Sequence, residues 1–425
     1  MKANLSAIQT KLIPIIFGLI LFFVAFYAVK GVARGNLGNA KFLGALVVAV
    51  GVILMLDKKY WIICPASQLL QFNIPQIPFN SEELGCLTII AMYFVRLGLH
   101  KEQPIKFNGI ILWALPVLFW MCFIFALNPA GMNIFGGTSI GSRFYIKILL
   151  GFFTMCIFSS LSLSEKDCRL LFRVLLISSI LAFLKTISSG VDSSEYSNTN
   201  YQLLGTVPIF MLVFSHYSLR QILLSWFKIF ICFVCLVMTI YSGKRRGLGT
   251  LLVIPILRTF FTGREKMLTF CCFAVGLFFC LFLVIGDGLA YDLPKSVQRS
   301  LSTIVPKYAD NFGGTTDIFR EEVWKYGRRV IRQNPWFGRK GFAMNRMEMS
   351  WVVHRDVGVD YEGHALAGNW HSTWYSYACD FGIPCLVLWV IFTFYYLFYV
   401  VKVVKKSSEL RYTHSCALYY ALFFF

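Results

Sequence analysis

The sequence predicts an all-α polytopic membrane protein, with about 12 transmembrane helices and one large, partly helical loop. The 425 residues are 57% hydrophobic and 14% charged, with a mean hydropathy of +0.65. A soluble protein cannot bury that much apolar surface. The charge is also uneven, because residues 289–369 hold 12 bases and 9 acids between long apolar runs. We therefore expect membrane helices in residues 1–287 and 373–425, separated by a loop over residues 288–372.

Apolar runs typical of membrane helices recur along the whole chain. Those before the charged loop are residues 12–30, 42–56, 84–99, 109–127, 144–161, 170–188, 201–218, 222–241, 247–261 and 267–285. Residues 60–78 are interrupted by prolines and are expected to form a broken span. After the loop come residues 373–401 and a short run from Tyr412 to Phe425, where we expect the sequence to be truncated. Residues 12–30 are long enough to span a membrane, which disfavours a signal peptide.

The basic loops indicate how the chain is threaded through the membrane. Under the positive-inside rule, basic residues gather on the cytoplasmic side. Here these positions are residues 58–59, 100–106, 165–169, 220, 258–266 and 402–411. The large charged loop then falls on the outer side. Because most bases sit at the ends of apolar runs, the net charge of +19 favours a membrane explanation over nucleic-acid binding. Thirteen cysteines, mostly inside apolar runs, indicate packing rather than a disulfide framework or a metal or redox site.

Two groups of bases fall on the outer side against this rule. Arg143 and Lys147 lie one helical turn apart, and Lys244, Arg245 and Arg246 follow one another between two glycines. Bases placed there are costly unless they meet an anion. Snorkelling to lipid phosphates is the alternative. Both explanations stay open for the first group, whereas the glycine-flanked group favours an anion site.

The charged loop contains one strong helical pattern. Its apolar positions, at helical spacing, are Phe319, Val323, Tyr326 and Val330. Asp317 is the expected N-cap, and the helix should end before Pro335. Arg320 would then lie near free N–H groups at the helix start, which is an anion-binding arrangement. The alternative is a surface arginine paired with a neighbouring glutamate.

His371 stands where the loop ends and the next apolar run begins. A histidine titrates near neutral pH and can act as a general base. His354 and His364 are nearby competitors. Since a lone histidine is more often structural, spacing alone leaves its role open.

The order of these parts resembles the O-antigen ligase and O-antigen polymerase superfamily of bacterial envelope glycosyltransferases. The similar pieces are Ser242-Gly243-Lys244-Arg245, Arg320 with Trp324, Pro335-Trp336-Phe337-Gly338 with Gly341, His371, and Asp380-Phe381-Gly382. They cover residues 240–388, while the N-terminal half is similar only in being a set of spans. The sequence departs from the family in three places. Ser372 replaces an Asn, two residues rather than one separate Gly338 from Gly341, and either Arg245 or Arg246 fits the first motif.

The resemblance implies a multi-pass inner-membrane enzyme with a periplasmic active site, and hence a periplasmic charged loop. The enzyme would transfer a glycan from undecaprenyl diphosphate to an acceptor hydroxyl with inversion, without a metal or cofactor. His371 would be the base, and Arg245 and Arg320 would bind the diphosphate. Weaker contacts to phosphate or lipid are expected for Arg246, Lys244, Arg143 and Lys147. The acceptor stays open between lipid A–core, another glycan and protein Ser or Thr.

Two other classes of protein fit parts of the pattern. A lipid-linked polysaccharide flippase would use the same bases to bind a lipid diphosphate. Such transporters usually show repeated halves, and we find no internal repeat in the sequence. A structural or sensor membrane protein would use the loop to bind a partner, and its motif residues would tolerate alanine.

Overall fold

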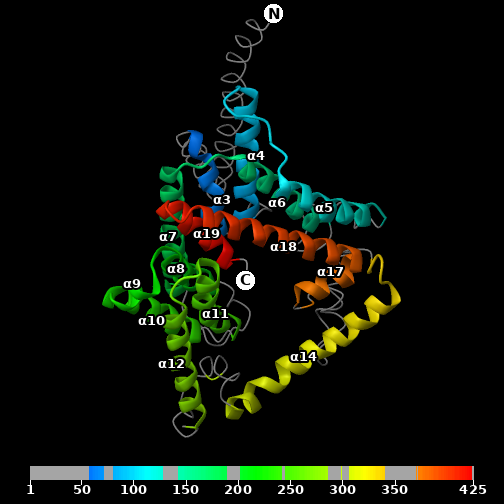
Figure 1. Ribbon diagram of the computed structural model, residues 1–425. Coiled ribbons are helices and arrows are strands. Elements are labelled where there is room, and N and C mark those ends of the chain that lie inside the picture. The colour runs from blue at the N-terminus through cyan, green and yellow to red at the C-terminus, as the bar shows by residue number, and fades with distance from the viewer. Residues whose placement is uncertain are drawn as a thin grey trace, which may run out of the picture. The chain divides into compact units, whose positions relative to one another are not determined.

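The computed structural model describes residues 57–70, 80–127, 142–188, 202–241, 245–285, 298, 306–339, 370 and 372–423. Over these residues the chain forms fourteen α-helices and one 3-10 helix, and no β-strand (Figure 1). The chain divides into two compact units, Met1–Lys106 and Phe107–Phe425, and each is described by itself. The all-α prediction is confirmed for the part of the chain that the structure describes.

The first unit contains η1 (Asp57–Ile62), α3 (Ile63–Leu70) and α4 (Ser81–Gly98). Helix α3 packs on α4. Asn80 begins α4 with a capping box, because its side chain accepts from the Glu83 N–H at 2.9 Å and the Glu83 carboxylate accepts from the Asn80 N–H at 2.8 Å. These two bonds satisfy donors that a helix start otherwise leaves free.

The expected spans of this unit are only partly covered. The interrupted segment from residue 60 to 78 is helical as far as Leu70. The expected spans at residues 12–30 and 42–56 lie outside the described residues.

The second unit holds twelve helices within its described residues. They are α5 (Gly109–Leu127), α6 (Ser142–Ser160), α7 (Glu165–Ser188), α8 (Gln202–His216), α9 (Leu219–Leu223), α10 (Trp226–Tyr241), α11 (Arg245–Thr262), α12 (Lys266–Ile285), α14 (Pro306–Gln333), α17 (Thr373–Phe381), α18 (Ile383–Lys406) and α19 (Arg411–Phe423). Helix α19 packs on α7, α8 and α18, while α5 packs on α6 and α18. The C-terminal helices therefore lie against both the middle and the start of this unit (Figure 1).

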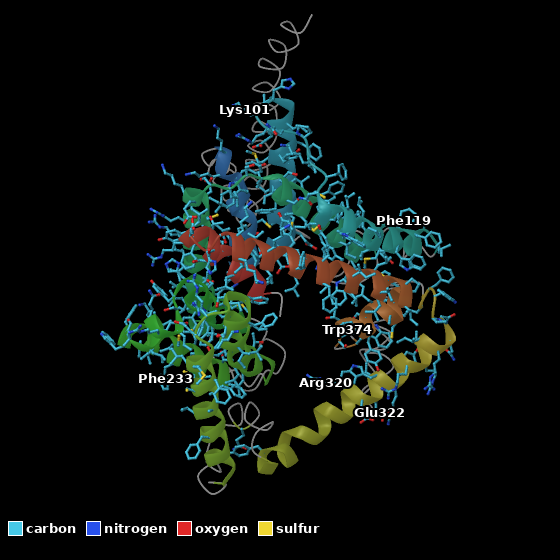
Figure 2. All side chains as sticks on the ribbon, viewed as in Figure 1. Lys101, Phe119, Phe233, Arg320, Glu322 and Trp374 are labelled. Atoms are coloured by element: carbon cyan, nitrogen blue, oxygen red, sulfur yellow. The ribbon has the colours of Figure 1, made fainter. Side chains whose placement is uncertain are left out.

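Apolar side chains cover much of the surface as well as the core. Phe119, Phe260 and Phe278 are each more than 70% exposed, and Figure 2 shows Phe119 and Phe233 among the outward side chains. Helices α5 and α18 are long and apolar enough to cross a membrane. An apolar outer surface on long apolar helices is consistent with a membrane protein.

Two expected spans are broken in the structure. The run at residues 222–241 becomes α9 and α10, and the run at residues 373–401 becomes α17 and α18. The second break falls at Gly382, whose φ of +85° cannot continue a right-handed helix. A mostly apolar run therefore contains a corner, and only α18 is long enough to span.

The helix in the charged loop begins earlier than the sequence suggested. Helix α14 starts at Pro306, so the expected N-cap at Asp317 is wrong. Proline suits a first helical position, and Gly313 and Gly314 cost only about 1 kcal/mol each inside a helix. Arg320 therefore lies in the middle of α14, far from the free N–H groups of its first turn.

Two carboxylates tie helix ends together. Glu165, the first residue of α7, accepts from the backbone N–H groups of Tyr412 at 2.6 Å and Thr413 at 2.9 Å, in the first turn of α19. Glu265, between α11 and α12, accepts from the Leu219 N–H at 2.8 Å at the start of α9 and from Arg258 at 3.0 Å. Each carboxylate caps a helix that is distant in sequence, and we call them the glutamate caps.

Candidate functional site

Helix α14 presents one apolar face to α17. Val323 is fully buried on this face, and Trp324 donates its indole N–H to the Trp370 carbonyl at 3.0 Å. A Cβ added to Gly327 would stand 2.8 Å from the Tyr375 ring and 3.2 Å from the Cys379 sulfur. Glycine therefore allows α14 to approach α17 closely.

After α14, the turn at residues 334–339 docks on the corner between α17 and α18. The Arg339 N–H donates to the Cys379 carbonyl at 2.8 Å, and the Ile383 N–H donates to the Pro335 carbonyl at 2.8 Å. Gly338 has a φ of +57°, and a Cβ on Gly382 would overlap the Trp336 carbonyl. Only glycine combines that backbone conformation with so close an approach. The two glycine motifs of the sequence thus form one interlocked corner.

A buried carboxylate lies inside this corner. Asp380 has 0% exposure, and its Oδ1 accepts from Arg339 Nε at 2.6 Å and from Trp370 Nε1 at 3.0 Å. The Arg339 guanidinium also lies 5.5 Å from the Trp370 ring. We call these three residues the Asp380 joint. It connects the turn that follows α14, Trp370 in the charged loop and the end of α17.

The Asp380 joint is not fully satisfied. Oδ2 of Asp380 is buried and has no hydrogen-bond partner among the described residues. Burial raises the pKa of Asp380 to about 6, although Arg339 and the Trp370 indole act in the opposite direction. Buried polar atoms are nearly always bonded, and exceptions concentrate where a protein does chemistry.

Helix α5 also packs on the corner. Trp120 donates its indole N–H to the Phe381 carbonyl at 2.8 Å and stacks on Phe337 with ring centroids 6.1 Å apart. Phe381 and Cys385 belong to the same buried cluster as Met121. The corner is therefore fixed to one of the two helices long enough to span.

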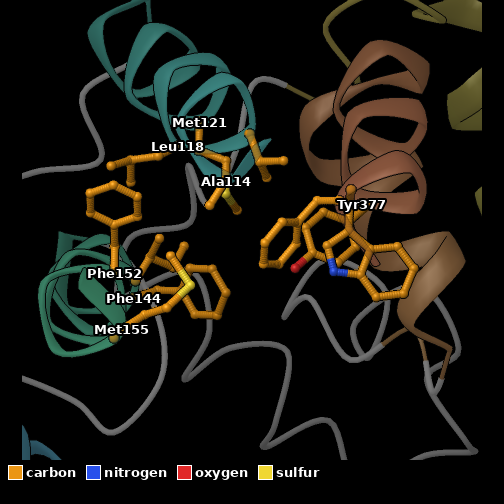
Figure 3. A pocket seen from close by; sticks show the side chains of 12 residues that line it. Ala114, Leu118, Met121, Phe144, Phe152, Met155 and Tyr377 are labelled. Atoms are coloured by element: carbon orange, nitrogen blue, oxygen red, sulfur yellow. The ribbon is translucent and has the colours of Figure 1, made fainter. Parts of the chain in front are cut away.

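An apolar cavity lies beside this support. It is open on one side, has a volume of about 200 Å³ and is lined by side chains of α5, α6, α17 and α18 (Figure 3). Its wall includes Met121, Phe144, Met155 and Tyr377. The lining is mostly apolar and holds no charged side chain, so it suits a hydrocarbon chain better than a phosphate.

Arg320 lies on α14 one turn before Val323, at the edge of the face that packs on α17. Its side chain is exposed. Figure 2 shows Arg320 and Glu322 projecting from different sides of α14, with Glu322 on the outer side. Arg320 is thus near the α14–α17 contact, although not at a helix start as the sequence suggested.

The helix start instead belongs to Arg245 and Arg246. They are the first two residues of α11, where free N–H groups and the helix dipole favour an anion. Lys244 lies outside the described residues. Helix α11 packs on α8, α10, α18 and α19, whereas α14 packs on α17.

Arg143 and Lys147 occupy the first two turns of α6. Lys147 is partly buried and engaged in contacts, which fits either anion binding or snorkelling.

His371 lies outside the described residues, and both of its neighbours are described. Trp370 is fully buried in the Asp380 joint. Ser372 begins α17, and its carbonyl accepts from the Ser376 N–H at 3.0 Å. The structure therefore describes the residues on both sides of His371 in the sequence. His354 and His364 also lie outside the described residues.

A family model described as O-Antigen ligase matches residues 230–390 of the chain. These residues belong to the O-antigen ligase superfamily. The ligase-family stretch starts inside α10 and ends inside α18, so it contains α11, α14, α17 and the whole Asp380 joint. The resemblance seen in the motifs is confirmed. No curated protein and no solved structure matches the chain.

Sequence reasoning missed two members of the Asp380 joint. Arg339 and Trp370 had no assigned role, and the acid-glycine motif was a match without a mechanism. One signal was present, because Arg339 is one of the two residues that lengthen the usual Gly-x-Gly. Its carboxylate partner, Asp380, lies 41 positions later, and no local pattern connects them. Among the described residues, no group of three or more His, Cys, Asp or Glu side chains is placed to hold a metal ion.

Proposed function

We propose that this chain transfers a glycan from a polyprenyl diphosphate, specifically undecaprenyl diphosphate, to an acceptor hydroxyl. The O-antigen ligase match over residues 230–390 carries the proposal. The enzyme would sit in the bacterial inner membrane with the charged loop and active site in the periplasm. The acceptor would be lipid A–core or another glycan.

The leaving group in this reaction is a diphosphate, and arginines suit it. Arg245 would bind it from the first turn of α11, where the helix dipole adds to the guanidinium charge. Arg320 would approach it from α14. Bidentate charge-assisted hydrogen bonds from these two residues would stabilise the negative charge that develops as the bond to the sugar breaks. Arg246, Lys244, Arg143 and Lys147 would make weaker phosphate or lipid contacts.

His371 would be the general base. The acceptor oxygen attacks the anomeric carbon, the bond from that carbon to the diphosphate oxygen breaks, and the histidine takes the hydroxyl proton. Attack opposite to the leaving group inverts the anomeric centre. The Asp380 joint supports this role because it fixes Trp370, the residue before His371, in a buried site. With arginines supplying the positive charge, the step needs no metal.

Transfer by purified protein would test the proposal. The assay would combine a labelled undecaprenyl-diphosphate glycan with lipid A–core, glycan and peptide acceptors. His371→Ala should lower the rate by about 10²–10⁴-fold, and Arg320→Ala should also lower it strongly. Lys325→Ala is the matched control, because Lys325 is exposed on the same helix and paired with Glu322 at 2.6 Å.

Three results would contradict the proposal or redirect it. Full transfer by His371→Ala or Arg320→Ala would exclude the assigned roles. Movement of the lipid across a vesicle membrane without any product would favour a flippase. Labelling of the peptide alone would favour a protein O-oligosaccharyltransferase. Comparing Arg245→Ala with Arg246→Ala would show which arginine belongs to the first motif.

A further inference from the structure

One side of α14, outside the apolar face that packs on α17, carries a row of bases. Arg328, Arg329 and Arg332 are all exposed, and their spacing places them on one side of the helix, away from Val323 and Val330. No acid occurs in the sequence between Glu322 and Glu348. We call these three residues the arginine stripe.

Neighbouring acids do not neutralise the stripe. One ion pair on this helix joins Lys325 to Glu322 at 2.6 Å, and Arg328 donates to the Tyr375 hydroxyl at 3.3 Å. Arg329 and Arg332 carry no ion pair within the described residues. Bases near a helix C-terminus interact favourably with the helix dipole, but three adjacent guanidinium groups also repel one another. A shared anionic partner would remove that repulsion.

The position of the stripe relative to a membrane follows from α18. Its 24 residues span about 36 Å, slightly more than the roughly 30 Å of a hydrocarbon core, so its first residue lies near the membrane boundary. That residue, Ile383, donates its N–H to the Pro335 carbonyl at 2.8 Å. The turn that follows α14 therefore sits at the level where the hydrocarbon ends.

Aromatic residues on this turn fit the same level. Trp336 is 68% exposed, and Phe337 stacks on Trp120 of α5. Exposed tryptophan is typical of the membrane–water interface. About 8 Å of helix separates Arg328 from the end of α14 at Gln333. The arginine stripe is thus within reach of the phosphate layer.

We propose that the arginine stripe binds the phosphate groups of anionic phospholipids and holds the end of α14 at the membrane surface, with Trp336 in the interface. The inference rests on the proposed function only in that α5 and α18 cross a membrane. Bound in this way, α14 would hold Arg320 at a fixed distance from lipid-linked substrates.

Lipid binding to the purified full chain tests the proposal directly. Native mass spectrometry from detergent micelles would compare retention of phosphatidylglycerol with that of zwitterionic phosphatidylcholine. The wild type should prefer phosphatidylglycerol. Each base near an anionic surface contributes about a fivefold gain in affinity, so Arg329→Gln with Arg332→Gln should lower retention by about twentyfold to thirtyfold. Lys325→Gln removes a base that is already neutralised and should keep the preference.

Several results would overturn the proposal. One such result is a wild type with no preference between the two lipids. Another is a Lys325→Gln variant that loses as much retention of phosphatidylglycerol as the double variant. Displacement of phosphatidylglycerol by equimolar inorganic pyrophosphate would assign the stripe to a soluble or leaving-group phosphate instead. The double variant should retain glycan transfer in detergent. A wild-type chain that selects phosphatidylglycerol but transfers no glycan would refute the proposed function and leave the lipid site standing.

Discussion

Carboxylates join helix ends at two kinds of place in this molecule, the half-buried glutamate caps and the fully buried Asp380. The glutamate caps are well satisfied, since Glu165 accepts from two backbone N–H groups and from the Thr413 hydroxyl. Burial would raise the pKa of Glu165, but these hydrogen bonds outweigh it and hold the pKa below its ordinary value. The same balance lowers the pKa of Glu265. Within the described part of the chain, Asp380 has one bonded oxygen, and burial raises its pKa to about 6.

The difference separates stability from function. A fully bonded carboxylate stabilises the fold at little cost, whereas a buried oxygen without a partner is costly and persists where a site needs it. The Asp380 joint lies inside the ligase-family stretch and contains Trp370, the residue before His371 in the sequence. Glu165 lies outside that stretch, whereas Glu265 lies inside it, between α11 and α12. We therefore expect the joint to act on the reaction and the caps to act on the fold.

Removing Asp380 should have the largest effect. Asp380→Ala leaves the Arg339 guanidinium and the Trp370 indole without their acceptor, and breaking such a buried pair costs about 3–5 kcal/mol. Thermal unfolding in detergent should show a markedly lower Tm, and glycan transfer should be lost. A wild-type Tm in this variant would show that the joint does not stabilise the fold.

A change of pH should alter the stability contributed by the two kinds of carboxylate in opposite directions. The pKa of Asp380 is raised in the folded state. Its contribution to the free energy of unfolding is therefore full below pH 4 and is lost as the pH rises through about 6, a change of about 2–3 kcal/mol. The lowered pKa of Glu165 gives stability that is present above its unfolded pKa and lost at lower pH. The Tm advantage of wild type over Asp380→Asn should grow from pH 7 to pH 5. Its advantage over Glu165→Gln should shrink as the pH falls toward 4. Equal pH responses would contradict the comparison.

Substituting the corner glycine should have a smaller but clear effect. Gly382→Ala forces a positive φ on alanine and brings its Cβ against the Trp336 carbonyl, at a cost of about 1–3 kcal/mol. Gly276→Ala is the matched control, since a Cβ there meets no atom within 4 Å. Both the Tm and the rate of glycan transfer should fall in Gly382→Ala. Neither should change in Gly276→Ala. An equal Tm and an equal transfer rate in the two variants would contradict the role assigned to the corner at Gly382.

Removing a glutamate cap should have the smallest effect. Glu165→Ala deletes a helix cap, which costs about 0.5–2 kcal/mol. Tm should fall slightly, while the transfer rate per folded molecule stays unchanged. A specific loss of transfer would place this region in the reaction.

Much of this architecture was predictable from the sequence, because long apolar runs and basic loops are local signals. The runs in the described residues all became helical. The breaks were harder to predict, since Gly382 stands in an apolar stretch and its backbone conformation is set by the turn that packs on it. The start of α14 was also missed, because Asp317 is a good N-cap in sequence while the structure continues the helix back to Pro306.

The candidate site shows the same limit. Arg245 and Arg320 were identifiable as motif bases, but their positions in their helices were not: the helix start belongs to Arg245 and the mid-helix position to Arg320. The bond between Arg339 and Asp380 joins residues 41 positions apart. Only tertiary packing brings them together, so no periodicity in the chain could reveal it.

The transfer rate per folded molecule in two isosteric variants tests the central claim most directly. Asp380→Asn keeps the shape of the joint and removes its charge, and Glu165→Gln does the same at a cap. We predict a roughly hundredfold slower transfer for Asp380→Asn, as expected for a misplaced reactive group, and a wild-type rate for Glu165→Gln. Equal rates in the two variants would contradict the division between a joint that serves the reaction and caps that serve the fold.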